Sequence, residues 1–199
     1  MQRIEAGTLR GRKLLALPRG VDGLRPTGAR VRGAIFDRLQ AEVVGARVLD
    51  LFAGSGALSF EALSRGARSA WLVERDARVV RHLHRQAEAL GVEAHCRIIR
   101  DDAQALVGAP PSPHTTFDLV FVDPPFATPE VFAPIAAGLV DHGWLARDAI
   151  VVCESERVRG KTLAVAWPPE LAVERARAYG QAHLELLRLR AQASKSAPQ

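Results

Sequence analysis

Two hydrophobic patterns alternate along most of this chain. Short apolar runs occupy residues 47–51, 70–74, 94–99, 117–122 and 149–153, and apolar side chains recur at helical spacing in residues 57–65, 76–90 and 129–139. Short apolar runs between helices are typical of strands buried on both faces. The alternation predicts an α/β fold, a mostly parallel sheet with helices on both faces. Residues 173–179 and 183–189 predict an antiparallel pair joined at Gly180-Gln181.

The first 24 residues follow a different pattern. Short alternating stretches broken by glycines predict a small β-hairpin, with Arg10, Arg12 and Lys13 near its turn. A two-stranded hairpin is not stable alone, so it must lean on the main domain or on a substrate. We therefore expect three parts: an extension at 1–24, a main domain at 25–190 and a frayed tail at 191–199.

A helix of about 15 residues is predicted to follow the hairpin. It begins at Arg25-Pro26-Thr27, with Thr27 as its N-cap. Apolar side chains recur every four residues and predict a buried stripe of Val31, Ile35 and Leu39. Arg30 and Arg32 fall outside that stripe, which predicts that both are exposed.

Charge is unevenly distributed over the 199 residues, whose formal net charge is +5. Residues 1–47 hold ten Arg or Lys against four acids, a net of +6. Residues 48–170 have a net of −4, and residues 171–199 have a net of +3. A basic arm on a mildly acidic body indicates a polyanionic partner, with a merely solvated basic surface as the alternative.

Several protein classes are disfavoured by composition. No apolar run approaches the roughly 20 residues that span a bilayer, and arginines interrupt any N-terminal signal core. Cys96 and Cys153 are expected to be two buried thiols of a cytosolic protein, and two cysteines are too few for structural zinc. His82 and His84, two residues apart in a helix, face different directions. We expect no membrane segment, no metal and a cytoplasmic location.

The first strand ends in a glycine turn preceded by a carboxylate, Asp50. No Lys follows Gly56, which excludes a Walker A loop, and Ser59 stands where a dinucleotide fingerprint has a third Gly or Ala. Gly54 and Gly56 let the backbone turn sharply and approach a ligand. Asp50 would repel a pyrophosphate and instead suits a cation such as an ammonium or a sulfonium.

Acids also follow the next two predicted strands. Glu74 can accept hydrogen bonds from both hydroxyls of a ribose. Asp102 can accept from an adenine amino group, with the Ala103 amide at the ring, and Asp101 is the competing candidate. Because the carboxyl ends of parallel strands meet at one edge, these acids predict one ligand site.

The sharpest motif, residues 123–126, follows the 117–122 run. Proline fixes its own φ and holds the preceding residue extended, so the Asp123 side chain and the Pro124 carbonyl become two fixed acceptors. Two such acceptors fit a planar amino group, and Phe126 offers a face on which a flipped base can stack. Positioning of the amine then does most of the chemical work.

With these motifs the chain resembles the class I S-adenosylmethionine-dependent methyltransferases. Within them it is similar to the RsmD family, bacterial enzymes that methylate N2 of one guanine in 16S ribosomal RNA. The most specific similarity lies outside the shared core, in Arg3-Ile4, Ala6-Gly7, residues 11–14, Arg25-Pro26-Thr27, residues 30–32 and Phe36. Gly33 and Asp37 depart from the family pattern, which has Glu and Asn there, and this puts contacts of that helix in doubt.

The resemblance implies a seven-stranded sheet of order 3-2-1-4-5-7-6 with strand 7 antiparallel. It also implies a monomeric cytosolic enzyme that acts on the small ribosomal subunit or an assembly intermediate. The implied S-adenosylmethionine contacts are Asp50, Phe52, Ala53, Gly54, Ser55, Gly56, Glu74, Arg75, Asp102, Ala103 and Asp123. The implied catalytic residues are Asp123, Pro124, Pro125 and Phe126. The expected RNA contacts are Arg10, Arg12, Lys13, Arg25, Thr27, Arg30 and Arg32.

Other functions remain open on the residues alone. The 123–126 motif serves any planar amine, so an adenine-N6 methyltransferase of DNA or RNA is the main alternative, and the amide of a protein partner is a weaker one. A non-catalytic RNA-binding assembly factor is the alternative outside enzymes. The presence of Asp50, Glu74 and Asp123 together argues against it.

Overall fold

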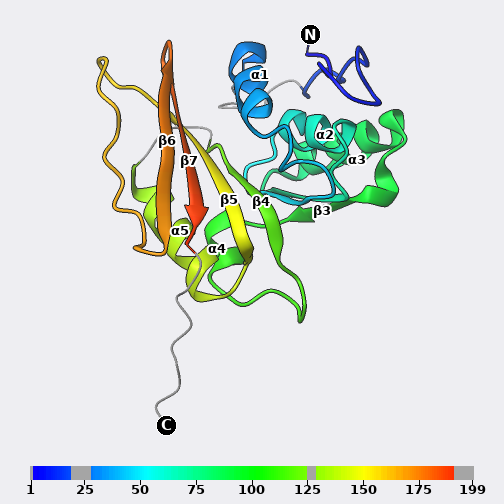
Figure 1. The fold of residues 1–199 in the computed structure, drawn as a ribbon. Helices are drawn as coiled ribbons and strands as arrows, with labels where there is room; N and C mark the ends of the chain where they lie inside the picture. The colour runs from blue at the N-terminus through cyan, green and yellow to red at the C-terminus, as the bar shows by residue number, and fades with distance from the viewer. Residues whose placement is uncertain (1, 19–27, 125–128, 191–199) are drawn as a thin grey trace.

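The computed structural model describes residues 2–18, 28–124 and 129–190 (Figure 1). The predicted contacts of Arg25, Thr27, Pro125 and Phe126 and the tail at 191–199 lie outside the described residues. The prediction that Thr27 caps the first helix is wrong, because that helix begins at Ala29 and Gly28 is its N-cap. All elements named below belong to the described part of the chain.

A single sheet of seven strands forms the centre of the fold (Figure 1). The strands are β1 (Arg47–Asp50), β2 (Ser69–Glu74), β3 (Cys96–Arg100), β4 (Phe117–Val122), β5 (Leu145–Glu156), β6 (Leu171–Tyr179) and β7 (Ala182–Leu189). Their order is β3-β2-β1-β4-β5-β7-β6, with β1 to β5 parallel and β7 antiparallel to both of its neighbours. The expected α/β class, strand order and antiparallel strand are therefore confirmed.

Helices cover both faces of the sheet. They are α1 (Ala29–Arg38), α2 (Ala57–Ser64), α3 (Ala77–Leu90), α4 (Ala103–Val107) and α5 (Pro129–Asp141), with a short 3-10 helix, η1 (Glu93–His95). Buried side chains of α1, α2 and α3 pack with alternate strand residues such as Val48 and Phe121. Those of α4 and α5 pack on the opposite face, with residues such as Leu49 and Val120. Side chains point alternately to the two faces of a strand, so both cores are built from the same short apolar runs.

Most predicted elements lie within a few residues of their observed positions, and the differences have local causes. Strand β3 begins at Cys96 rather than at 94, because residues 93–95 form the 3-10 helix. Strand β5 extends beyond the predicted 149–153 in both directions, since it pairs with β4 and β7 along its length. Helix α4 was not predicted.

The two cysteines differ in exposure. Cys153 is buried as expected, whereas Cys96 is only half-buried, and both are free thiols.

The N-terminal segment, residues 2–18, folds back on itself and docks on the helices. One antiparallel bridge pairs Arg3 with Lys13, and the Ile4 amide donates to the Arg12 carbonyl at 3.0 Å. Ile4 and Leu14 are only 2% and 3% exposed and belong to the core that contains α1 and α2. The segment therefore forms part of the folded body rather than a loose arm.

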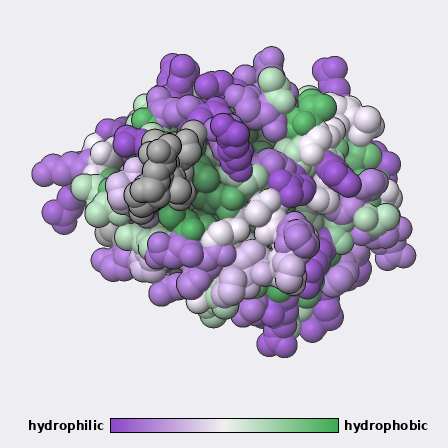
Figure 2. Space-filling model, turned by 60° about the horizontal axis from the view of Figure 1, so that its bottom comes forward, coloured by the Kyte–Doolittle hydropathy of each residue, from purple (hydrophilic) through white to green (hydrophobic). Residues whose placement is uncertain are grey.

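The surface carries few exposed large apolar side chains. Among the described residues they are Leu15, Val44, Val158 and Val173, which lie in different parts of the fold. Figure 2 shows a largely hydrophilic face on which hydrophobic residues gather mainly in one hollow. None of the described helices is long and apolar enough to cross a membrane.

Candidate cofactor and amine site

Three carboxylates gather at the carboxyl edge of the sheet, where β1 lies between β2 and β4. Asp50 at the end of β1 is in register with Leu72 and Phe121. Glu74 and Asp123 each lie two residues beyond those partners and therefore flank Asp50. The charges of both acids also act on Asp50 and raise its pKa, as expected for neighbours at this edge.

Asp50 is buried, with 1% of its surface exposed, and only part of its carboxylate is satisfied. The Ser59 hydroxyl donates to Oδ2 at 2.8 Å, while Oδ1 is buried and has no hydrogen-bond partner in the described part of the chain. The Phe52 amide lies close enough to favour the ionised form but does not reach hydrogen-bonding geometry with Oδ1. Burial, together with the charges of Asp123 and Glu74, raises the pKa of Asp50 to about 7, against the opposing bond from Ser59. A buried acceptor next to two other acids is suited to a cationic donor.

We expect Asp50 to make the ligand-free protein less stable as pH rises. The pKa is raised from 3.8 to about 7 on folding, so the stabilising contribution is complete below about pH 4 and is lost as pH rises towards 7. Asp50→Asn cannot ionise, so its free energy of unfolding should gain on wild type by roughly 1–4 kcal/mol between pH 4 and pH 8. Urea unfolding of both proteins across this range measures the difference.

Asp118→Asn provides a contrast of opposite sign. The hydrogen bond from Arg47 lowers the pKa of Asp118, so its contribution is lost as pH falls. The outcome that contradicts the prediction for Asp50 is a pair of parallel stability curves. If wild type and Asp50→Asn change equally between pH 4 and pH 8, Asp50 does not titrate in that range.

The glycine turn is held by Glu74. The Gly54 amide donates to Glu74 Oε2 at 3.2 Å, and the Asp76 amide donates to Oε1 at 2.9 Å. Gly54 has φ +50, a left-handed conformation that favours glycine. A carboxylate has about four acceptor sites, so Glu74 keeps capacity for two more donors such as ribose hydroxyls.

Gly56 is needed for a reason that the sequence did not reveal. Its φ is +75, and an added Cβ would lie 2.2 Å from the Phe60 ring. The close approach at Gly56 is therefore to the core. That Gly56 also lets the backbone approach a ligand stays a prediction.

The acids after β3 have a structural role in addition to any ligand contact. Asp102 caps α4, because its Oδ1 accepts from the Gln104 and Ala105 amides at 2.9 and 3.0 Å. Asp101 accepts from the Asp102 amide at 2.8 Å. Both acids are exposed and Ala103 is buried, and the choice between the two acids as adenine contact stays a prediction.

The motif at 123–126 begins where β4 ends. Val122 is buried, Asp123 is half-buried and Pro124 is buried, so the two described residues of the motif are held between strand and core. Among the other predicted cofactor contacts, Phe52 is half-buried and Arg75 is exposed, while Ala53 and Ser55 are buried in the turn. The Ser55 hydroxyl donates to Gln2 Oε1 at 3.0 Å, a contact between the turn and the N-terminal segment that was not predicted.

Arg32 corrects the predicted set of RNA contacts. Arg10, Arg12, Lys13 and Arg30 are exposed as such contacts require. Arg32 is 1% exposed and forms ion pairs with Glu5 and Glu61, so the prediction that it is exposed and contacts phosphate is wrong. The apolar residues of this helix, which recur every four positions, could not reveal that Arg32 is buried. A buried arginine needs acidic partners, and these come from other segments of the chain.

Two further residues were missed because they are polar residues in a helix that is buried throughout. Ser59 and Glu61 lie in α2, every residue of which is buried. Their polarity, like that of Ser64 in the same helix, was the available signal, since the remaining residues of α2 are apolar. Within the described residues no group of three His, Cys, Asp or Glu side chains is placed to hold a metal ion.

Comparison with known proteins agrees with this geometry. A family described as "Conserved hypothetical protein 95" matches residues 2–188. The chain is 38% identical over 195 residues to ribosomal RNA small subunit methyltransferase D of Escherichia coli (strain K12), a match that covers 98% of this chain and 93% of the relative. The protein of the same name from Haemophilus influenzae is 38% identical over 157 residues, which cover 78% of this chain and 79% of the relative.

Solved structures show the same fold. "Putative methyltransferase yhhF" from Escherichia coli superimposes with a TM-score of 0.83 at 38% identity, covering 96% of this chain and 99% of that one. An RNA methyltransferase from Salinibacter ruber, solved with S-adenosyl-L-homocysteine, has a TM-score of 0.63 at 15% identity, covering 88% of this chain and all of that one, and shows the fold alone. The chain belongs to the family of conserved hypothetical protein 95, the RsmD methyltransferases.

Proposed function

We propose that this protein transfers the methyl group of S-adenosylmethionine to the exocyclic N2 amine of a guanine in 16S ribosomal RNA. The observation that carries the proposal is the placement of Asp123 and Pro124 at the end of β4, beside the buried and partly unsatisfied carboxylate of Asp50. One edge of the sheet thus combines an acceptor pair for an amine with an anionic site for a cationic methyl donor. The name of the relative in Escherichia coli supports a ribosomal RNA substrate.

The residues at this edge fit S-adenosylmethionine. Asp50 Oδ1, buried without a donor, would accept from the ammonium of the methionine part, and Glu74 would accept from the ribose hydroxyls. Asp102 or Asp101 would receive the adenine amine, next to Ala103. When bound, S-adenosylmethionine supplies an electrophilic methyl group carried on a sulfonium.

The protein's own contribution to the reaction is to hold the amine. Asp123 and the Pro124 carbonyl would accept its two hydrogens, which localises the nitrogen lone pair and fixes its direction. Phe126 would stack on the base. The amine loses a proton as it is methylated, and either Asp123 or water receives that proton.

The exposed cations of the N-terminal segment would bind the RNA backbone. Arg10, Arg12 and Lys13 are exposed, and no ion pair joins them to a carboxylate among the described residues. Because the segment and α1 can touch the backbone on either side of a flipped guanine, we expect better activity on an assembled or partly assembled 30S particle than on naked RNA. We propose a cytoplasmic monomer.

Replacing an exposed cation should change the salt dependence of RNA binding. Each phosphate contact releases counterions, so log Kd changes with log salt by about 0.7 to 0.9 per contact. Arg10→Ala should flatten this slope by up to about one and leave S-adenosylmethionine affinity unchanged. Filter binding at several salt concentrations measures the slope.

Arg147→Ala serves as the control, since Arg147 is also exposed but lies near the start of β5, away from the carboxyl edge of the sheet. An unchanged slope in Arg10→Ala would indicate that this charge is only a solvated surface. Deleting the segment would be a poorer test, because Ile4 and Leu14 belong to the core.

Methyl transfer from radiolabelled S-adenosylmethionine to 30S particles, followed by nucleoside analysis, tests the proposed function as a whole. Label in N2-methylguanosine is the expected result. Label in N6-methyladenosine would favour the alternative amine, which the same acceptor pair accommodates. The absence of any transfer together with intact RNA binding would favour a non-catalytic assembly factor.

A further inference from the structure

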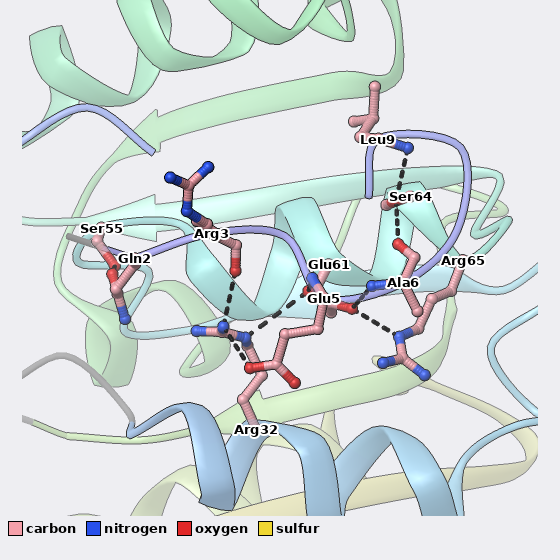
Figure 3. A network of polar contacts seen from close by, with 10 residues as sticks. All are labelled: Gln2, Arg3, Glu5, Ala6, Leu9, Arg32, Ser55, Glu61, Ser64 and Arg65. Atoms are coloured by element: carbon pink, nitrogen blue, oxygen red, sulfur yellow. Dashed lines mark hydrogen bonds and ion pairs between the residues drawn. The ribbon is translucent and has the colours of Figure 1, made fainter. Parts of the chain in front are cut away.

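A buried network of charges connects the N-terminal segment to α1 and α2 (Figure 3). Arg32 Nη2 donates to Glu5 Oε1 at 2.7 Å and to the Arg3 carbonyl at 2.8 Å, and Arg32 Nε lies 3.7 Å from Glu61 Oε2. The side chain of Glu61 is completely buried and that of Arg32 is 2% exposed. Arg32 and Glu61 are therefore buried together, and Glu5, with 31% of its side chain exposed, closes the network on the outer side.

Glu61 holds the backbone of the segment directly. Its Oε2 accepts from the Glu5 amide at 2.8 Å and its Oε1 from the Ala6 amide at 3.0 Å. Arg65, one turn later in α2, donates to the same Oε1 at 2.8 Å. The carboxylate thus has donors on both oxygens, two of them backbone amides of the segment, as Figure 3 shows.

A second anchor lies next to the first. The Thr8 amide donates to the Ser64 carbonyl at 2.8 Å, and the Leu9 amide donates to the Ser64 hydroxyl at 2.9 Å. Gly7 has φ +80, and an added Cβ would lie 1.8 Å from the Ser64 carbonyl oxygen. The segment therefore approaches α2 so closely that only glycine fits at this position.

This network is better suited to fixing a position than to adding stability. Burying charges costs several kcal/mol per ion, and a buried ion pair often contributes little net stability. Removing one partner is costly, because the other charge stays buried and uncompensated. Arg32 Nη2 has its two acceptors, Glu5 Oε1 and the Arg3 carbonyl, while the segment lies against α1 with Glu5 beside Gly33, where an added Cβ would lie 3.3 Å from Glu5 Oε2. The other two nitrogens, Nε and Nη1, are buried without a hydrogen-bond partner among the described residues, so a segment that left this position would remove the only acceptors that the guanidinium has there.

That position places the exposed cations at a fixed distance from the glycine turn. Gln2, at the start of the segment, accepts from the Ser55 hydroxyl in the turn at 3.0 Å. Arg12, near the other end, donates to the Ala89 carbonyl of α3. Arg10 and Lys13, which flank Arg12 in the chain, are both exposed. Phosphate contacts made by such a rigid segment would set the register of an RNA on the sheet edge.

We infer that Glu61 is a positioning residue for RNA recognition: with Arg32 it fixes residues 2–14 as a rigid cationic platform beside the cofactor turn. The inference rests on the proposed function. A segment ordered in advance pays its conformational cost during folding, whereas a loosened one must pay it on binding RNA. Glu61 touches neither the cofactor turn nor any exposed cation, so its effect on catalysis is indirect.

Glu61→Gln tests the inference through the division between KM and kcat. We expect the KM for 30S particles to rise roughly tenfold, as the segment's side chains and backbone must now be ordered on binding, with kcat and S-adenosylmethionine affinity within about twofold of wild type. Hydrogen exchange should speed up at the amides of Glu5, Ala6, Thr8 and Leu9 while the α2 amides stay protected. Glu174→Gln is the control, because it removes the same charge from an exposed ion pair with Arg188.

Two glycines of the segment give a second, independent test. Gly7 and Gly11 have φ +80 and +82, so alanine carries the same conformational cost at both. An added Cβ meets α2 at Gly7 but meets nothing within 4 Å at Gly11. Gly7→Ala should therefore raise the KM for 30S particles like Glu61→Gln, and Gly11→Ala should not. If Glu61→Gln fails to fold, the comparison of Gly7→Ala with Gly11→Ala still tests the inference.

The outcomes separate this inference from the proposed function. A wild-type protein that transfers no methyl group to 30S particles contradicts the proposed function. If wild type is active, an unchanged KM in both Glu61→Gln and Gly7→Ala overturns the inference. So does a parallel loss of kcat, cofactor affinity and melting temperature, because that combination indicates general destabilisation.

Discussion

Asp123→Ala is expected to lower the rate of methyl transfer by at least about a hundredfold, the scale for losing a positioned polar group in a transition state. Asp123 follows the last buried residue of β4 and precedes a buried proline, so its carboxylate is held in place before the substrate arrives. Alanine removes one of the two acceptors for the amine and leaves the Pro124 carbonyl. Single-turnover transfer to 30S particles measures the rate of the chemical step.

Cofactor affinity should change much less, within severalfold, because Asp50 and Glu74 remain. Calorimetry with S-adenosylmethionine checks this point, and Asp141→Ala provides a control at an exposed acid at the end of α5. A rate near that of wild type in Asp123→Ala would refute the assigned role.

Asp123→Asn separates the two contributions that Asp123 can make. Asparagine keeps an acceptor oxygen of the same reach but cannot take a proton. If Asp123 acts only as an acceptor for the amine, the asparagine variant should keep part of the activity that alanine loses. If Asp123 also receives the proton, both variants should be equally slow.

The sheet was predictable because its strands carry their signal locally. The 117–122 run matches β4 residue for residue, since a strand buried on both faces is apolar along most of its length, and Asp118, its one polar residue, is only half-buried and pairs with Arg47. The predicted helix over 76–90 is found at Ala77–Leu90, with Asp76 as an N-cap acceptor and Gly91 as a left-handed C-cap. The acids at the strand ends were predictable for the same reason, because their position follows from where each run stops.

Features that depend on partners from distant segments were not predictable. Arg32 looked like a surface residue because the α1 pattern contains no acid that would accompany it into the core; Glu5 and Glu61 come from other parts of the chain. Helix α4 was not predictable because it is short and because Asp102, which caps it, is also a candidate ligand contact. Gly33 departs from the family pattern, and only the fold shows that Glu5 lies against it.

The same contrast explains why the charge of residues 1–47 was a partial guide. The excess of ten basic residues over four acids predicted a polyanion-binding arm. The structure divides these charges into two groups. Arg32 is buried and paired with acids, whereas Arg10 and Lys13 are exposed. Net charge reports the sum of the two groups, and only the fold separates the cation that fixes the segment from the cations available to RNA.

Gly54→Val is expected to abolish measurable cofactor binding while the protein still folds. Gly54 has φ +50, a conformation that a β-branched residue adopts only as an outlier, and its amide donates to Glu74 Oε2. Valine would displace the turn from Glu74 and put methyl groups where the backbone faces the ligand. Strain of about 1–3 kcal/mol combined with a lost contact corresponds to roughly a hundredfold or weaker binding of S-adenosylmethionine.

Calorimetry should show one-to-one binding to wild type and none to Gly54→Val at the same concentrations. Gly45→Val is the matched control, because Gly45 also has positive φ, +75, but an added Cβ meets nothing within 4 Å and the residue precedes β1 at the far end from the turn. If both valine variants bind equally weakly, the loss comes from destabilisation and not from the turn. Wild-type affinity in Gly54→Val would place the cofactor elsewhere, since no ligand held by that turn could tolerate both the strain and the added methyl groups.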